Sequence, residues 1–207
     1  IKNRLEGSIR ITYIGDLILL KDQIVSAKND ITGKYEFDDI FQYTSKHFHE
    51  SDFTIATFEG PLAGNSTNYS VSNFDDGLSL RLNFPDEIAE AVKRAGINLV
   101  STANNHLLDK NVEGAIRTID ILDKYNISHV GSYRNKEEKD KMNIIDIKGI
   151  KVAVLAYTSK MNYYKTDKIY LTLEKANERA VHIYTKFGFV PTGEIDEGED
   201  IYVYEKS

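Results

Sequence analysis

The sequence predicts an α/β fold built on a parallel sheet, because apolar strands and amphipathic segments alternate along the chain. The runs that we interpret as the main strands are Ile9–Ile14, Phe53–Phe58 and Asn98–Ala103. Each run leads into polar residues of types that bind metal ions. In a parallel sheet the carboxyl ends of the strands lie along one edge, and that edge is where binding sites form.

The first strand is expected from about Ser8 to Gly15, and a polar loop follows it. A helix comes next, because apolar side chains recur there at near-helical spacing. These side chains are Phe37, Ile40, Phe41 and Phe48.

A long loop separates the second strand from the next helix. Residues 60–83 are rich in Gly, Ser and Asn, and a loop of this length in a compact domain is usually functional or disordered. We expect it to overhang the carboxyl edge of the sheet. Pro85-Asp86-Glu87 opens a helix that Gly96 closes. Val112–Tyr125 forms a further helix, with Ile119 and Leu122 among its inward side chains.

The chain changes character near residues 160–167, where a polar stretch carries no periodic signal. Before it we expect a short strand and a hairpin; after it we expect a strand, a helix and a second hairpin. The ranges before the change are Ser128–Gly131, Asn143–Ile147 and Lys151–Tyr157; those after it are Ile169–Leu173, Asn177–Phe187, Phe189–Ile195 and Ile201–Tyr204. We therefore divide the chain into residues 1–160 and 161–207.

Composition excludes several classes of protein. The net charge of −6 argues against nucleic acid as a partner. No apolar run approaches ~20 residues, so no membrane span is expected. The absence of cysteine excludes disulfides and thiolate chemistry. The sequence begins at Ile1 rather than Met, so we expect a trimmed N-terminus, which is compatible with loss of a signal or anchor.

The polar residues that follow the three strands predict a metal site. Asp16, Glu59, Asn105 and His106 are far apart in sequence, yet they converge if the strands are parallel neighbours. Two carboxylates, an amide and an imidazole suit Mn²⁺, Mg²⁺ or Zn²⁺.

Each of these residues also has an ordinary structural interpretation. Asp16 is equally compatible with a helix cap or a loop position, and Glu59 with a solvated loop acid. Asn105 and His106 resist such an interpretation more, because buried amides and imidazoles need hydrogen-bond partners. Asp109, three residues after His106, would either orient the imidazole ring or cap the helix that begins near Asn111.

Three motifs together resemble the CapA family of capsule-biosynthesis, or poly-γ-glutamate synthesis, proteins. The motifs are Gly15-Asp16, Phe58-Glu59-Gly60-Pro61-Leu62 and Ser101-Thr102-Ala103-Asn104-Asn105-His106-Leu107-Leu108-Asp109. The resemblance covers about residues 8–160. Family members usually carry Asn-Leu-Glu where this chain has Thr57-Phe58-Glu59, a departure that keeps the acid.

The resemblance implies a metallophosphatase-like αββα sandwich, present here in part. It implies Asp16, Glu59 and Asn105 as metal ligands, with His106, supported by Asp109, as an acid or charge stabiliser. Further ligands in that fold come from a second half that we do not find in this sequence, so we expect metal binding to be weak and incomplete. The implied partners are an anionic capsule polymer or its synthesis machinery, at the cell surface or outside the cell, with any membrane anchor in a segment outside this sequence.

The last part of the chain is similar to the C-terminal third of a GNAT acetyltransferase. The similarity rests on the spacing Asn-x-x-Ala-x-x-x-Tyr-x-Lys-x-Gly-Phe, from Asn177 to Phe189. It places Asn177 and Tyr184 near acetyl-CoA. The glycine-rich pyrophosphate loop of that family is missing, so acetyl-CoA binding is not expected, and Tyr184 fits equally well as a packing residue.

The sequence thus leads to one main functional hypothesis and two alternatives. The main hypothesis is a capsule-polymer protein with a metal-dependent hydrolase- or transferase-like site, which is incomplete or degenerate. The first alternative is a non-catalytic chimera or scaffold built from enzyme fragments, and the second is an N-acetyltransferase. In each case we expect residues 167–207 to pack against the first domain.

Overall fold

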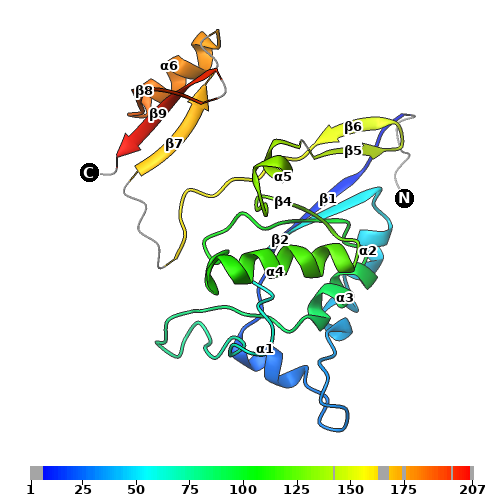
Figure 1. Ribbon diagram of the computed structural model, residues 1–207. Helices are drawn as coiled ribbons and strands as arrows, with labels where there is room; N and C mark the ends of the chain where they lie inside the picture. Colours follow the sequence, from blue (N-terminus) through cyan, green and yellow to red (C-terminus); the bar gives the residue numbers. More distant parts are fainter. Residues whose placement is uncertain (1–6, 142, 163–167, 174–175, 197, 206–207) are drawn as a thin grey trace. The chain divides into compact units, whose positions relative to one another are not determined.

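The protein is described by a computed structural model that covers residues 7–141, 143–162, 168–173, 176–196 and 198–205 (Figure 1). The chain forms two compact units, Ile1–Tyr163 and Tyr164–Ser207. Each unit is described by itself.

The first unit contains a parallel sheet of four strands. They are β1 (Ile11–Leu17), β2 (Phe53–Phe58), β3 (Leu99–Ser101) and β4 (Ser128–Val130). Their order in the sheet is β1-β2-β3-β4, with every neighbouring pair parallel. This order is what successive crossovers of one hand produce. The predicted α/β fold with a parallel sheet is confirmed.

Strand β1 continues further than we predicted. It runs through Asp16 to Leu17, and its pairing with β2 shifts between Ile14 and Asp16. Gly15 is the extra residue of this bulge, a position at which a strand bends and re-aims the next side chain. Asp16 therefore lies within the strand, next to its end, and not after it.

The segment between β1 and β2 holds three short helical elements instead of one helix. These are α1 (Lys21–Ser26), η1 (Asp38–Phe41) and α2 (Ser45–His49). The prediction of a single helix through Phe37 and Phe48 was wrong, although both side chains are buried. Between Phe37 and Phe48 the chain makes turns whose hydrogen bonds join residues three apart in sequence. The N–H of Thr44 donates to the Phe41 carbonyl, and the N–H of His47 donates to the Thr44 carbonyl.

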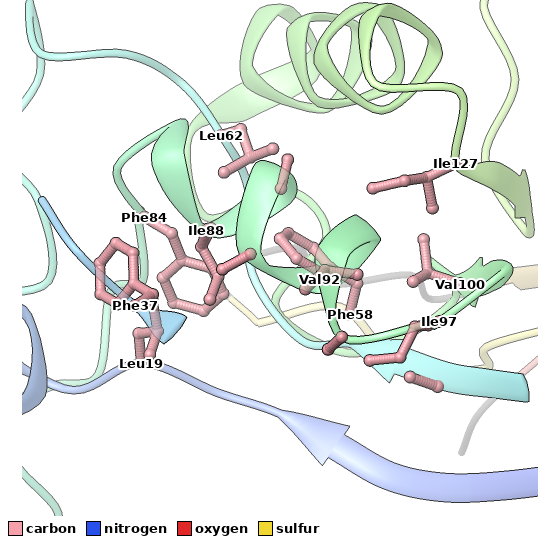
Figure 2. Packing of buried hydrophobic residues seen from close by; sticks show 14 of the residues in the cluster. Leu19, Phe37, Phe58, Leu62, Phe84, Ile88, Val92, Ile97, Val100 and Ile127 are labelled. Carbon is pink, nitrogen blue, oxygen red and sulfur yellow. The ribbon is translucent and has the colours of Figure 1, made fainter. Parts of the chain in front are cut away.

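The two longer helices of this unit, both predicted, cover one face of the sheet. Helix α3 (Glu87–Arg94) and helix α4 (Asn111–Lys124) lie on the face that presents Ala56 and Val100 (Figure 1). The core between them is fully enclosed, and its side chains are drawn in Figure 2. Its largest members include Phe58, Leu62, Phe84, Ile88, Val92, Ile97 and Leu122. Residues 60–83 form the predicted long loop without helix or strand.

The opposite face of the sheet is more open on β1. Ile11 and Tyr13 are 40% and 63% exposed. The hydroxyl group of Tyr13 is hydrogen-bonded to that of Thr57 across the strand pair, at 2.6 Å. The sheet therefore carries its core on one side only along this edge strand.

The first unit ends with a short helix and a hairpin. Helix α5 (Lys136–Asp140) was not predicted. The hairpin of β5 (Ile144–Ile147) and β6 (Ile150–Ala153) turns at Lys148-Gly149, as predicted, but its second strand is shorter than the expected Lys151–Tyr157. Among the described residues, no helix is long and apolar enough to cross a membrane.

The second unit is a strand, a helix and a hairpin. Strand β7 (Lys168–Leu173) precedes helix α6 (Glu178–Lys186), and β8 (Val190–Asp196) pairs with β9 (Glu199–Glu205). The antiparallel sheet has the order β7-β9-β8. Helix α6 has no buried residue, and Phe187, just after it, is 72% exposed.

Candidate metal and catalytic site

Asp16 and Glu59 meet at the carboxyl edge of the parallel sheet. Asp16 pairs in register with Thr57, and the backbone N–H of Glu59 donates to the carbonyl of Leu17 at 3.0 Å. This hydrogen bond extends the strand ladder past the last residue of β2, so Glu59 is held beside the bulged end of β1. The pairing of the two strand ends thus brings the Asp16 and Glu59 residues next to each other at this edge.

The environment of Glu59 disfavours its ionised form. Burial, the largest cause, raises the pKa of the Glu59 carboxyl above its ordinary value, and the negative charge of Asp16 raises it further. A hydrogen bond to Asp16 and the charge of Asp109 act in the same direction, whereas the nearby His106 lowers the pKa. The charges of Asp16, His106 and Asp109 thus all act on the Glu59 carboxyl.

The turn after β3 is built by residues that bring this cluster together. Asn104 is buried, and its side-chain amide donates to the Phe58 carbonyl at 2.8 Å, which ties the turn to the end of β2. Its side-chain oxygen accepts the backbone N–H of His106 at 2.9 Å. On the other side, Gly131 lies so close to the turn that an added Cβ would be 2.6 Å from the Cβ of Ala103. Only glycine allows this approach.

His106 and Asp109 form a buried pair. The Nδ1 atom of His106 is 2.6 Å from Oδ2 of Asp109, and their side chains are 7% and 0% exposed. Oδ2 also accepts the backbone N–H of Leu82 at 2.7 Å, which fastens the end of the long loop to the site. With Nδ1–H donating to the carboxylate, the Nε2 lone pair of His106 is left for another partner.

Asn162 is a site residue that the sequence did not reveal. Its side-chain nitrogen lies 3.2 Å from Nδ1 and 3.3 Å from Nε2 of His106, and its backbone N–H donates to the Asn105 carbonyl at 2.7 Å. Because Nδ1–H is directed at Asp109, the consistent hydrogen bond runs from the Asn162 amide to Nε2. Asn162 comes from the aperiodic segment before residue 163, where no local pattern could have marked it.

The remaining predicted residues are placed as follows. Asn105 is half-buried in the same turn, and its role as a metal ligand stays a prediction. Asp109 does not cap α4, because the N-cap position is occupied by Lys110, which makes no side-chain cap bond. His49 is hydrogen-bonded to the Arg94 carbonyl at 3.2 Å, and His129 to Asp123 at 3.2 Å, as ordinary polar residues.

The donor set suits a hard cation that keeps part of its water. Within the described ranges, no three His, Asp or Glu side chains are grouped closely enough to hold a metal ion by themselves. Asp16 and Glu59 would supply two carboxylates, the number with which proteins commonly hold Mg²⁺ while water fills the other positions. A structural zinc site needs four protein ligands. The residues therefore fit Mg²⁺ or Mn²⁺ better than Zn²⁺.

A second feature is compatible with a ligand at this place. Oδ1 of Asp109 is buried and has no hydrogen-bond partner among the residues that the structure describes. A buried carboxylate oxygen without a donor is costly, so a bound water or cation nearby would stabilise the site.

The two residues predicted from the GNAT resemblance have structural roles in the second unit. The side chain of Asn177 caps helix α6 by accepting the N–H of Ala180 at 3.1 Å. The ring of Tyr184 packs edge-on against Phe189, with 5.6 Å between centroids. The contact of Tyr184 agrees with its packing interpretation, and the expectation that acetyl-CoA does not bind stays a prediction.

Comparison with known proteins identifies similar sequences. The sequence model of a family described as "Bacterial capsule synthesis protein PGA_cap" matches residues 10–192. The capsule biosynthesis protein CapA of Bacillus anthracis is 29% identical over 161 residues, which cover 76% of this chain and 36% of that protein. The PGA biosynthesis protein CapA of Bacillus subtilis (strain 168) is 26% identical over 159 residues, which cover 76% of this chain and 39% of that protein.

Two facts qualify these similarities. The chain spans well under half the length of either curated relative. The family match continues across residues 160–167 and includes all of helix α6. The predicted change of family near residue 160 is therefore not visible in this match.

Proposed function

Because the chain belongs to the bacterial capsule synthesis protein PGA_cap family, we propose that it acts in making or handling a capsule polymer through the Asp16–Glu59–His106 site. One observation carries this proposal. Glu59 is held beside Asp16 at the carboxyl edge of a parallel sheet, and Asn104 ties the turn that carries the buried His106–Asp109 pair to the same edge. The polymer would be anionic poly-γ-glutamate, because one relative is named for PGA biosynthesis.

We propose a metal-dependent hydrolase- or transferase-like reaction for this site. A divalent cation held by Asp16 and Glu59, with Asn105 nearby, would polarise a phosphoryl or acyl oxygen and lower the pKa of a bound water. The metallophosphatase-like sandwich implied by the sequence resemblance belongs to the same proposal. The parallel sheet with helices on one face supports the proposal of a metallophosphatase-like fold.

The chain's own residues would position and move a proton. Asp109 fixes the ring of His106 through Nδ1, which leaves Nε2 to hold a proton or to stabilise charge on the reacting group. The Asn162 amide, 3.3 Å from Nε2, would orient this atom. The loop tied to Asp109 through Leu82 would restrict access of water to the pair.

Binding of Mn²⁺ to Asp16 tests this proposal. Titration followed by electron paramagnetic resonance should show affinity in the micromolar range or weaker for the wild type, because the chain supplies few ligands. Asp16→Asn should weaken binding by more than about tenfold, since even the loss of an outer-shell partner costs 10–100-fold.

The matched control is Asp30→Asn, which changes an exposed loop acid outside the site and should leave the affinity unchanged. Equal affinities of the wild type and Asp16→Asn would contradict the proposal. Tight binding of two metal ions would show that further ligands complete the site.

One observation favours a second candidate, a non-catalytic scaffold. The described residues contain no group of three His, Asp or Glu side chains suited to a metal, and a scaffold would need none. Absence of Mn²⁺ binding at millimolar concentration would favour the scaffold.

The second unit gives the remaining alternative, an N-acetyltransferase fragment. Its strand–helix–hairpin order supports a GNAT-type origin, whereas the continuous family match to residue 192 weighs against it. An acetyl-CoA-dependent rise in melting temperature that Tyr184→Phe abolishes would support this alternative.

We also propose a location at the bacterial cell surface, because both relatives are named for capsule or PGA biosynthesis. Any membrane anchor would lie outside the described residues.

A further inference from the structure

An apolar cavity opens beside Asp16, and no role has been given to it so far. Its volume is about 150 Å³. It lies between the end of β1, helix η1 and the start of α3. The lining residues are Asp16, Leu17, Ile18, Leu19, Gln23, Ile40, Phe41, Phe58, Phe84 and Ile88. Figure 2 shows Leu19, Phe84 and Ile88 side by side on this wall.

The inner wall of the cavity belongs to the fixed core. Phe58, Phe84 and Ile88 are each at most 2% exposed. The rings of Phe58 and Phe84 meet edge to face, with 5.6 Å between centroids. Behind Phe84 lies Gly60, where an added Cβ would be 2.5 Å from the ring. Side chains held this tightly are not free to collapse into the space, so the cavity is preformed.

The size and lining of the cavity select an apolar occupant. A cavity of about 150 Å³ lined by Leu, Ile and Phe binds benzene in another protein and stays dry when empty. Most of the lining is apolar here, and the lining residues with polar side chains are Asp16 and Gln23. The Gln23 side-chain oxygen already accepts the backbone N–H of Leu20 at 2.8 Å. A short aliphatic chain or one aromatic ring fits this space.

Asp16 links the cavity to the carboxyl pair. It lines the cavity, and it lies beside Glu59, whose backbone N–H donates to the carbonyl of the neighbouring Leu17. We infer that the cavity receives a short aliphatic or aromatic segment of the substrate, next to the polar group that is held at Asp16 and Glu59. The binding of the substrate's polar group at Asp16 and Glu59 rests on the proposed function. The binding of an apolar segment in the cavity does not. The substrate class is a phosphoryl or acyl compound with an apolar segment close to its reacting group.

The first experiment tests the cavity alone, with benzene as the probe and without metal. Saturable methyl NMR shifts are expected for Leu19 and Ile88, whereas Leu122, a buried residue of α4 that does not line the cavity, should not respond. Ile40→Trp places a larger side chain at the rim, where Ile40 is 47% exposed, and should abolish the benzene shifts. Ile31→Trp is the matched control, because Ile31 is 96% exposed and lies outside the cavity.

Folding of both variants is checked by their methyl spectra before benzene is added. Absence of benzene shifts in the wild type would overturn the inference. It would also be overturned by equal shifts in a folded Ile40→Trp variant. Neither outcome depends on metal binding, so the proposed function is not tested by this arm.

The second experiment tests the link to the carboxyl pair, with methyl phosphate and n-butyl phosphate as probes in the presence of Mn²⁺. Each methylene that enters the cavity should strengthen binding about fourfold. The gain should disappear in Ile40→Trp while Mn²⁺ affinity remains. Equal affinity for both phosphates, with benzene still bound, would overturn the assignment to the substrate. Loss of Mn²⁺ binding alone would count against the proposed function and not against the cavity.

Discussion

At the scale of single residues, the environment of Glu59 makes the charged form of its side chain unfavourable in the folded state. Burial beside Asp16 raises the pKa of the Glu59 carboxyl above its ordinary value of 4.5. The folded state therefore holds this proton more tightly than the unfolded state. The resulting stabilisation is present below pH 4.5 and is lost as the pH rises through the raised pKa.

Glu59→Gln should make this effect visible, because glutamine keeps a neutral donor at every pH. Melting temperatures of the variant and the wild type, measured in a metal-free buffer, should be similar near pH 4. The variant should become the more stable of the two as the pH approaches neutrality. Glu137→Gln, at an exposed position of α5, should show no such trend. A constant difference at all pH values would contradict the assigned environment of Glu59.

The site residues differ in how far the sequence predicted their placement. His106 and Asp109 are three residues apart, so a local pattern indicated their contact, and the structure places their side-chain atoms 2.6 Å apart. Asp16 and Glu59 were predicted to meet at the carboxyl ends of parallel strands; the structure holds the backbone of Glu59 beside Asp16, and their joint role as metal ligands stays a prediction. Asn162 contacts His106 across 56 residues of sequence. Nothing local encodes a contact over that distance.

At the scale of elements, long periodic segments were predicted well and short ones were not. Helix α4 was expected over Val112–Tyr125 and is found over Asn111–Lys124, because it buries a full apolar face. Helix α1 has six residues and buries only Ile24, which is too little for a periodic signal. The bulge at Gly15 also escaped prediction, since an alternating pattern gives no sign of an extra residue.

The buried side chain of Asn83 joins separate parts of the long loop between β2 and α3. Asn83 is fully buried, and its amide nitrogen donates to the Gly64 carbonyl at 3.0 Å and to the Thr67 hydroxyl at 2.9 Å. Its side-chain oxygen accepts the backbone N–H of Ala63 at 2.8 Å. A loop without helix or strand has few other ways to satisfy its backbone.

Asn83→Ala should therefore loosen this loop without unfolding the sheet. Removing the side chain leaves a buried N–H and carbonyl groups unpaired, at a cost of about 1–3 kcal/mol each where water cannot replace it. Limited proteolysis should cut within residues 64–79 much faster than in the wild type. Asn65→Ala, at an exposed position of the same loop, is the control. Equal cleavage of Asn83→Ala and the wild type would show that the loop is held by other contacts.

At the scale of the whole molecule, the two units differ in how completely they enclose a core. In the first unit α4 buries Ala115, Ile119 and Leu122. In the second unit α6 buries nothing, and Phe187 and Ile195 are 72% and 59% exposed. A unit of this size has little apolar area to bury on its own. The prediction that residues 167–207 pack against the first domain arose from the same consideration and stays a prediction.

Phe187→Ala distinguishes a covered tail from an uncovered one. If no other surface covers the Phe187 side chain in solution, its replacement by alanine should change the free energy of unfolding by less than about 0.5 kcal/mol. If another surface covers the ring, the loss should reach about 3–5 kcal/mol, as for a core phenylalanine. Ile119→Ala, in the enclosed core of the first unit, should cost about 2–5 kcal/mol and calibrates the urea titration.

Hydrogen exchange gives the independent measurement: amides of α6 should exchange faster than those of α4. Slow exchange in α6 together with a large Phe187→Ala effect would contradict an uncovered helix and support packing of the tail.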